Sequence, residues 1–189
     1  MTTLTRTSAA GRCRRSRRLI GALLAGAAAA AADERVALSL SAKPDGDGVE
    51  ALDYPVTFPG DATAHLRTAT EQWRTFRALE FHIQWPADAP ADAQVLVFMK
   101  DWDYYWFQWL APARPRPGAT TRFAADLSPG AAGWEPVGHF GAWQFRTRME
   151  PREFGIRVFS ESPWSGQFRI ERAAGLVAPP DTRPPVIRD

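Results

Sequence analysis

The sequence predicts an all-β protein whose strands pair antiparallel in a sandwich or a barrel. Three observations predict this class: short runs that alternate apolar and polar residues, Pro- and Gly-rich turns at a spacing of roughly 8–12 residues, and weak helical periodicity. The 189 residues are 45% hydrophobic and 12% aromatic. That composition is enough for one domain with a core of its own.

Residues 1–32 have the pattern of a cleaved secretory signal peptide. This segment contains six Arg and no acidic residue, and an apolar, Ala-rich stretch fills 19–32. A stretch of 14 residues is shorter than the roughly 20 that a membrane-spanning anchor needs. We therefore expect cleavage within 30–33, a secreted or periplasmic protein, and no membrane span after cleavage. Residues 16–20 partly resemble a twin-arginine signal, and the export route stays open.

Two further counts exclude whole classes of function. Cys13 lies in the leader, so the mature chain has no cysteine for a disulfide, a zinc–thiolate site or a nucleophile. Residues 33–189 contain 17 Lys and Arg against 21 Asp and Glu, a net charge of −4. A protein that reads phosphates needs a basic surface, so we expect no nucleic-acid partner.

The first predicted elements are strands, with one place for a helix. A strand is expected over 36–41, followed by a turn at 45–48. The proline-free stretch 61–75 allows one short helix or turn. The clearest strand follows it, because alternate side chains of a half-buried strand face the core and solvent in turn. Its apolar set is Leu79, Phe81, Ile83 and Trp85, and its solvent set is Glu80, His82 and Gln84.

The rest of the domain is predicted to consist of strands joined by turns. Asp101-Trp102-Asp103 forms the connection of an aromatic hairpin. The last two strands form a closing pair across 160–166. The predicted strands are 95–99, 104–110, 120–127, 154–159 and 167–171. The domain is therefore assigned to 33–176, and 177–189 is expected to be an extended, Pro-rich C-terminal tail.

Several short motifs resemble a known superfamily. They are Gly155-Ile-Arg-Val-Phe159, Gly166-Gln-Phe-Arg-Ile-Glu171, Met99-Lys-Asp101 and Phe123-Ala-Ala-Asp-Leu127. Together they are similar to galactose-binding-like jelly rolls over about 70–176. The resemblance implies an antiparallel β-sandwich of jelly-roll type. Many members are bacterial carbohydrate-binding modules, which bind sugars without catalysis. Members often hold a structural calcium ion partly by an acidic residue of the last strand, where Glu171 stands in this chain.

The aromatic content gives the main functional indication. Four consecutive aromatic residues begin at Tyr104, so Tyr104, Trp106 and Gln108 share one strand face. The opposite face carries Tyr105, Phe107 and Trp109. We predict that the Gln108 face points outward, because a buried Gln needs hydrogen-bond partners. Exposed rings stack on sugars, and polar neighbours bind the hydroxyl groups. The expected ligand-binding residues are Tyr104, Trp106, Gln108, His82, Gln84, Arg157 and Arg169.

No catalytic residues are predicted. His65, His82 and His139 stand in unrelated contexts, without metal-ligand spacing or a nucleophile elbow. Asp101 and Asp103 could form a glycosidase pair, but acids that flank a hairpin are more often turn formers. No cofactor is expected apart from the calcium ion that the resemblance implies.

The leading hypothesis is a secreted, non-catalytic module that binds a glycan or polysaccharide through an aromatic platform. The alternative is a periplasmic or extracellular interaction or scaffold module without a sugar ligand, whose exposed rings meet another envelope protein. The outer ring set could also be covered by loops or by the N-terminal segment, which would leave no exposed platform. A glycan-active enzyme comes third.

Overall fold

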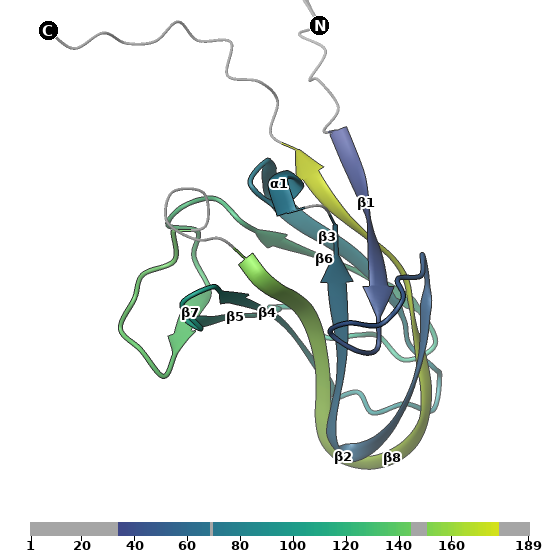
Figure 1. Ribbon diagram of the computed structural model, residues 1–189. Helices are drawn as coiled ribbons and strands as arrows, with labels where there is room; N and C mark the ends of the chain where they lie inside the picture. Colours follow the sequence, from purple (N-terminus) through teal and green to yellow (C-terminus); the bar gives the residue numbers. More distant parts are fainter. Residues whose placement is uncertain (1–33, 69, 145–150, 178–189) are drawn as a thin grey trace, which may run out of the picture. The chain divides into compact units, whose positions relative to one another are not determined.

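The computed structural model describes residues 34–68, 70–144 and 151–177, which form an antiparallel all-β domain (Figure 1). The predicted signal peptide and residues 178–189 of the predicted tail lie outside these residues. In the described ranges the one helix is the single turn α1 (Thr70–Trp73), and none is long and apolar enough to cross a bilayer.

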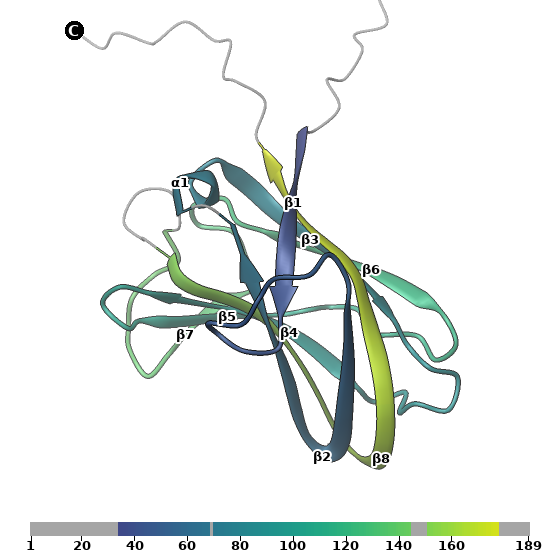
Figure 2. The same ribbon diagram turned by 45° about the vertical axis from the view of Figure 1, so that its right-hand side comes forward.

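Two long strands organise the domain. β2 (Leu52–Arg67) pairs antiparallel with β8 (Pro151–Val177) over nearly its whole length, with a register shift between Phe58 and Gly60. Figures 1 and 2 show the two strands turning together at the same end of the domain. Because both strands bend there, one continuous ladder folds over into two layers.

The first layer, here called the β5 layer, contains the half of β8 that ends near Ser160. This half pairs with β2 on one side and with β4 (Gln94–Asp101) on the other. β4 pairs with β5 (Trp106–Leu110), which pairs with the edge strand β7 (Trp134–Val137). The order across this layer is therefore β2-β8-β4-β5-β7.

The second layer, here called the β3 layer, contains the other half of β8. That half pairs with β3 (Phe76–Gln84), which pairs in turn with β6 (Thr120–Asp126). β1 (Glu34–Ser41) pairs with the end of β8 through its first residues and with the end of β2 through its last. It thus connects the two layers opposite the shared bend of β2 and β8.

The core lies between the layers and confirms the predicted register of β3. Leu79, Phe81 and Ile83 are 0% exposed and Trp85 is 1% exposed. They belong to one cluster with the inward residues of β4, of which Val97 is also fully buried. Burying large apolar side chains stabilises each by about 1.5–3 kcal/mol relative to exposure, so this cluster holds the layers together.

The structure corrects two of the expected elements. Residues 154–159 and 167–171 are not a hairpin pair but parts of the single strand β8, and 160–166 pairs with the bend of β2. The residues 61–67 continue β2, and the helix begins only at Thr70. β2 itself escaped prediction because Pro55 and Pro59 resemble strand breakers. The short edge strand β7 was also not predicted.

Candidate functional site

β5 presents one aromatic set to the core and one to solvent. Phe107 and Trp109 are 1% and 8% exposed, whereas Trp106 and Gln108 are partly exposed on the outer face. The predicted orientation of Trp106 is therefore confirmed. Tyr105 was expected in the core but is 48% exposed, with its ring 4.5 Å from that of His139. The chain enters β5 only at Trp106, so strand alternation does not govern Tyr105.

The turn between β4 and β5 holds Tyr104 in an unusual conformation. The Tyr104 amide donates to the carbonyl of Asp101, and the buried Asp101 carboxylate accepts from the Tyr105 amide at 2.8 Å. Asp101 therefore acts as the turn former that the sequence predicted. Tyr104 has φ 63°, a left-handed conformation that usually takes Gly in such hairpins, and its side chain is 61% exposed.

Aromatic rings line the outer face of the β5 layer across three strands. Phe98 of β4 points outward and packs over Gly155, where the absence of a Cβ leaves room for the ring. The Trp106 ring stacks on Phe98, with 4.9 Å between centroids and 17° between planes. The His65 ring from β2 meets Phe98 edge-on at 6.1 Å. Phe98 therefore supports one face of the Trp106 ring, and the Trp106 side chain stays partly exposed to solvent.

Basic side chains continue this row toward the turn. Lys100 Nζ lies 5.7 Å from the centroid of Tyr104 and 5.9 Å from that of Trp106. The guanidinium of Arg152 lies 4.6 Å from the Tyr104 ring and 5.5 Å from the Trp102 ring. Cations at these distances are attracted to the ring faces, by about 0.5–1 kcal/mol at exposed sites.

A hollow of about 500 Å³ lies beside the rings on the same outer face. Arg157 of β8 is bound there by Asp61 of β2 at 2.9 Å, while its Nε is buried without a hydrogen-bond partner. Gln108 and Glu135 line the hollow together with the apolar Leu110. Carboxylate, amide and guanidinium groups therefore stand beside apolar surface, as in sites that bind small polar ligands.

Three of the predicted ligand-binding residues lie on the opposite layer. Leu79, Phe81 and Ile83 point into the core from β3, so His82 and Gln84 face away from β5. Gln84 and Arg169 line a separate hollow of about 510 Å³, where Arg169 donates twice to Asp53 at 2.9 Å. The expected platform is therefore split: Tyr104, Trp106, Gln108 and Arg157 come together, and His82, Gln84 and Arg169 do not join them.

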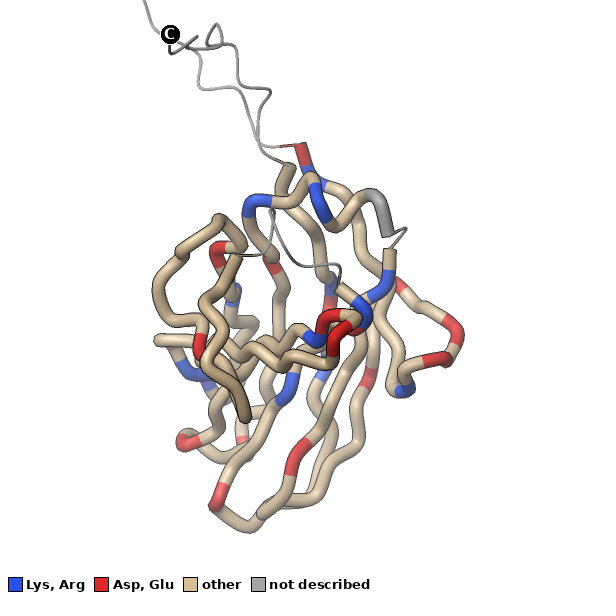
Figure 3. Tube along the Cα trace, turned by 60° about the vertical axis from the view of Figure 1, so that its left-hand side comes forward, with Lys and Arg blue, Asp and Glu red and all other residues tan. Residues whose placement is uncertain are grey.

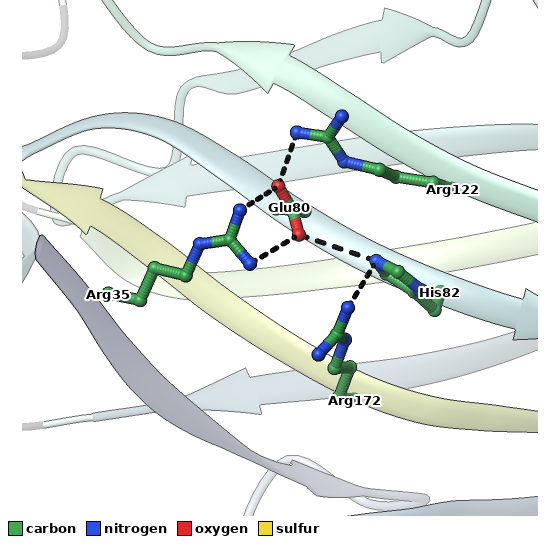
Figure 4. A network of polar contacts seen from close by, with 5 residues as sticks. All are labelled: Arg35, Glu80, His82, Arg122 and Arg172. Atoms are coloured by element: carbon green, nitrogen blue, oxygen red, sulfur yellow. Dashed lines mark hydrogen bonds and ion pairs between the residues drawn. The ribbon is translucent and has the colours of Figure 1, made fainter. Parts of the chain in front are cut away.

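His82 belongs instead to a network around a buried carboxylate (Figure 4). Glu80 is only 3% exposed, although alternation predicted it on a solvated face. Arg122 donates to it at 2.6 Å, and Arg35 reaches it at 3.4 Å. His82 Nε2 lies 3.3 Å from Glu80 and 3.2 Å from Arg172. That nitrogen can donate to Glu80 or accept from Arg172, but not both at once.

The arginines determine the ionisation of Glu80. Burial alone would raise its pKa, but the hydrogen bonds from Arg122 and His82 and the charges of Arg122 and Arg35 outweigh burial. The pKa of Glu80 is therefore held below its ordinary value near 4.5. The long arginine side chains also cover the carboxylate, and strand alternation could not have revealed this.

Glu171, the residue that the resemblance connects with calcium, lies on β8 and accepts a hydrogen bond from Thr120 at 3.4 Å. Across 34–68, 70–144 and 151–177, no group of three or more His, Cys, Asp or Glu gathers in a metal-binding arrangement.

Several residues of the outer face were missed at the level of sequence. Phe98, Lys100 and Arg152 flank the predicted rings, and Asp61 and His65 come from the unpredicted strand β2. The alternation of β4 could have identified Phe98 and Lys100 as outward-facing. Nothing in the sequence pattern placed Arg152 beside Tyr104.

Comparison with known proteins gives distant structural matches and no sequence match. No family model matches the chain, and no curated protein matches its sequence significantly. The solution structure of CtCBM11 is similar at TM-score 0.44 and 10% identity, over 79% of this chain and 98% of that one. The structure of PfGH50B is similar at TM-score 0.44 and 12% identity, over 78% of this chain. This chain spans only 22% of PfGH50B.

Proposed function

We propose that this protein is a non-catalytic carbohydrate-binding β-sandwich of jelly-roll type, and that the outer face of its β5 layer receives the glycan. The single observation that carries the proposal is Tyr104. Its ring is 61% exposed on a backbone with φ 63°. A left-handed conformation costs a non-Gly residue about 1–2 kcal/mol. A strained residue that offers its ring to solvent supports a binding role better than a structural one.

The neighbouring side chains suit a sugar. Phe98 covers one face of the Trp106 ring and Arg152 lies over the Tyr104 ring, so a pyranose would stack its C–H face on the remaining face of either ring. Gln108 can donate and accept hydrogen bonds with hydroxyl groups next to the Trp106 ring. Arg157 and Asp61 line the adjoining hollow as an ion pair at 2.9 Å. Their remaining N–H groups and carboxylate lone pairs can bind sugar hydroxyl groups there.

The test is retardation of the purified protein in native gels that contain single polysaccharides, chosen from a glycan-array screen. Trp106→Ala should abolish retardation, because weak binding that loses about 1.4 kcal/mol is weakened tenfold. Gln108→Ala should weaken it, whereas Gln84→Ala should not. These two variants are a matched pair, since both remove one outward Gln but from opposite layers.

Two results would contradict the proposal. Absence of binding to every glycan by the wild-type protein would remove its basis. Equal weakening by Gln84→Ala and Gln108→Ala would show that binding does not depend on the β5 face. Thermal unfolding of each variant shows whether a loss of binding is only a loss of folding.

A second candidate function is docking of another protein, favoured by exposed apolar side chains around β7. Phe140 is fully exposed, and Tyr105 and Val137 are 48% and 44% exposed. This function would be favoured over the first if the wild-type protein binds a protein partner but no glycan. Phe140→Ser should then lose that partner.

A further inference from the structure

The charge beside the aromatic row carries an inference about which sugars the face accepts. The chain from residue 33 onward is acidic, with a net charge of −4. Figure 3 shows basic and acidic residues interspersed along the trace. Because the chain from residue 33 onward is acidic overall, a local group of basic side chains is not a consequence of a high total positive charge.

Such a group surrounds a hollow of about 360 Å³ at the turn end of the β5 layer. Arg67, Lys100 and Arg152 line it, against the two carboxylates of Asp45 and Glu153. His65 also lines the hollow and lies 3.1 Å from Glu153.

The carboxylates do not neutralise the cation nearest the rings. Glu153 is shared, because it lies 3.1 Å from His65 and 3.9 Å from Lys100. Arg152 makes no ion pair with any carboxylate of the described residues, and its contacts are the ring faces of Tyr104 and Trp102. A guanidinium that lies over a ring keeps the N–H groups of its edge available to a ligand.

Lys100 connects this hollow to the sugar platform, because its Nζ is within 6 Å of the centroids of both Tyr104 and Trp106. A pyranose beside Tyr104 would thus place a substituent within reach of Lys100 and of Arg152, and one on Trp106 would place it within reach of Lys100. On the basis of the proposed function, we infer that the glycan is acidic, with a carboxylate or sulfate group held by Lys100 and Arg152.

The test uses pairs of polysaccharides that share a backbone and differ in charge. Polygalacturonate and its fully methyl-esterified form test the carboxylate, and dextran sulfate and dextran test the sulfate. The ratio of the two dissociation constants within each pair is measured by calorimetry on the purified protein. We expect the acidic member of one pair to bind at least about tenfold more tightly, with a preference that falls as salt rises.

Arg152→Gln should bring this ratio close to one. The matched control is Arg116→Gln, which removes the same charge from the exposed loop at the far end of β5. The control should keep the ratio. A separate pair, Lys100→Gln and Lys43→Gln, repeats the comparison with lysine.

The outcomes separate the inference from the proposed function. Equal or tighter binding of the neutral members overturns the acidic preference and leaves glycan binding intact. An equal loss in Arg116→Gln and Arg152→Gln also overturns it, because the attraction would then be general. Failure of all four polysaccharides and of the whole glycan screen overturns the proposed function itself.

Discussion

The ring of Trp106 lies on the ring of Phe98, and Phe98 lies across Gly155 of the neighbouring strand β8. This stack connects β8, in the middle of the β5 layer, with the Trp106 ring on the outer face of that layer. The Phe98 ring can pack against Gly155 only because Gly155 lacks a side chain. One methyl group at this position should therefore disturb both the packing of the layer and the binding of a glycan. The position of the partly exposed Trp106 ring therefore depends, through Phe98, on Gly155.

Gly155→Ala should lower the free energy of unfolding by about 1–3 kcal/mol, as overpacking does. Its Cβ would meet the Phe98 ring and lie 2.8 Å from the carbonyl oxygen of Ala64. Denaturant titration measures the loss, and gel retardation should weaken with it. Phe98→Leu in the same chain should recover part of the stability, because a smaller side chain relieves the contact. An unchanged midpoint for Gly155→Ala would contradict this packing.

Tyr104→Gly and Tyr104→Ala should have the same effect on glycan binding and different effects on stability. Both remove the ring, so both should weaken retardation. Gly adopts φ near 63° without a Cβ penalty, so its variant should be more stable than the Ala variant by about 1 kcal/mol. Thermal and urea unfolding decide this. Equal stability of the two variants would show that the turn relaxes when the ring is absent.

Glu80 should make folding sensitive to acid. Its pKa is lower in the folded protein than its ordinary value near 4.5, so its stabilisation is present above that pH. The stabilisation is lost as pH falls through the lowered pKa of the folded state. Glu80→Gln should reduce the stability at pH 7 and flatten its dependence below pH 4.5. A parallel pH dependence in the variant would show that other groups cause the acid sensitivity.

Arg122→Ala should destabilise the protein more than Arg35→Ala. Arg122 donates to Glu80 at 2.6 Å, whereas Arg35 approaches at 3.4 Å. Both arginines are about half exposed, so their own removal costs little, and the loss reflects the buried carboxylate that keeps fewer partners. Denaturant midpoints at pH 7 compare the two variants. An equal loss would mean that Arg35 and Arg122 replace each other.

Export should remove the first 32 residues. Six Arg followed by a short Ala-rich segment predict cleavage within 30–33. Intact mass and N-terminal sequencing of the exported protein test this, and a full-length mass in the envelope fraction would indicate an anchor instead.

What the sequence by itself determined was local. Alternation was enough to turn Leu79, Phe81 and Ile83 into the core. Alternation together with the polar Gln108 placed Trp106 outside and Phe107 inside. These assignments need only the geometry of one strand, in which neighbouring side chains point to opposite faces. Asp101 was recognised as a turn former for the same reason, because its carboxylate acts within four residues of itself.

What only the tertiary structure decided was which strands share a layer and what covers each face. His82 and Trp106 are both outward residues, yet they lie on opposite layers, because β3 and β4 pair with different halves of β8. The polar run in the middle of β8 resembles a turn until β2 supplies a partner with a matching bend. Glu80 is buried by arginines from β1 and β6, strands that are distant in sequence. Strand pairing and the burial of a side chain by distant residues depend on contacts across the whole chain. The alternation of apolar and polar residues along one strand contains no information about such contacts.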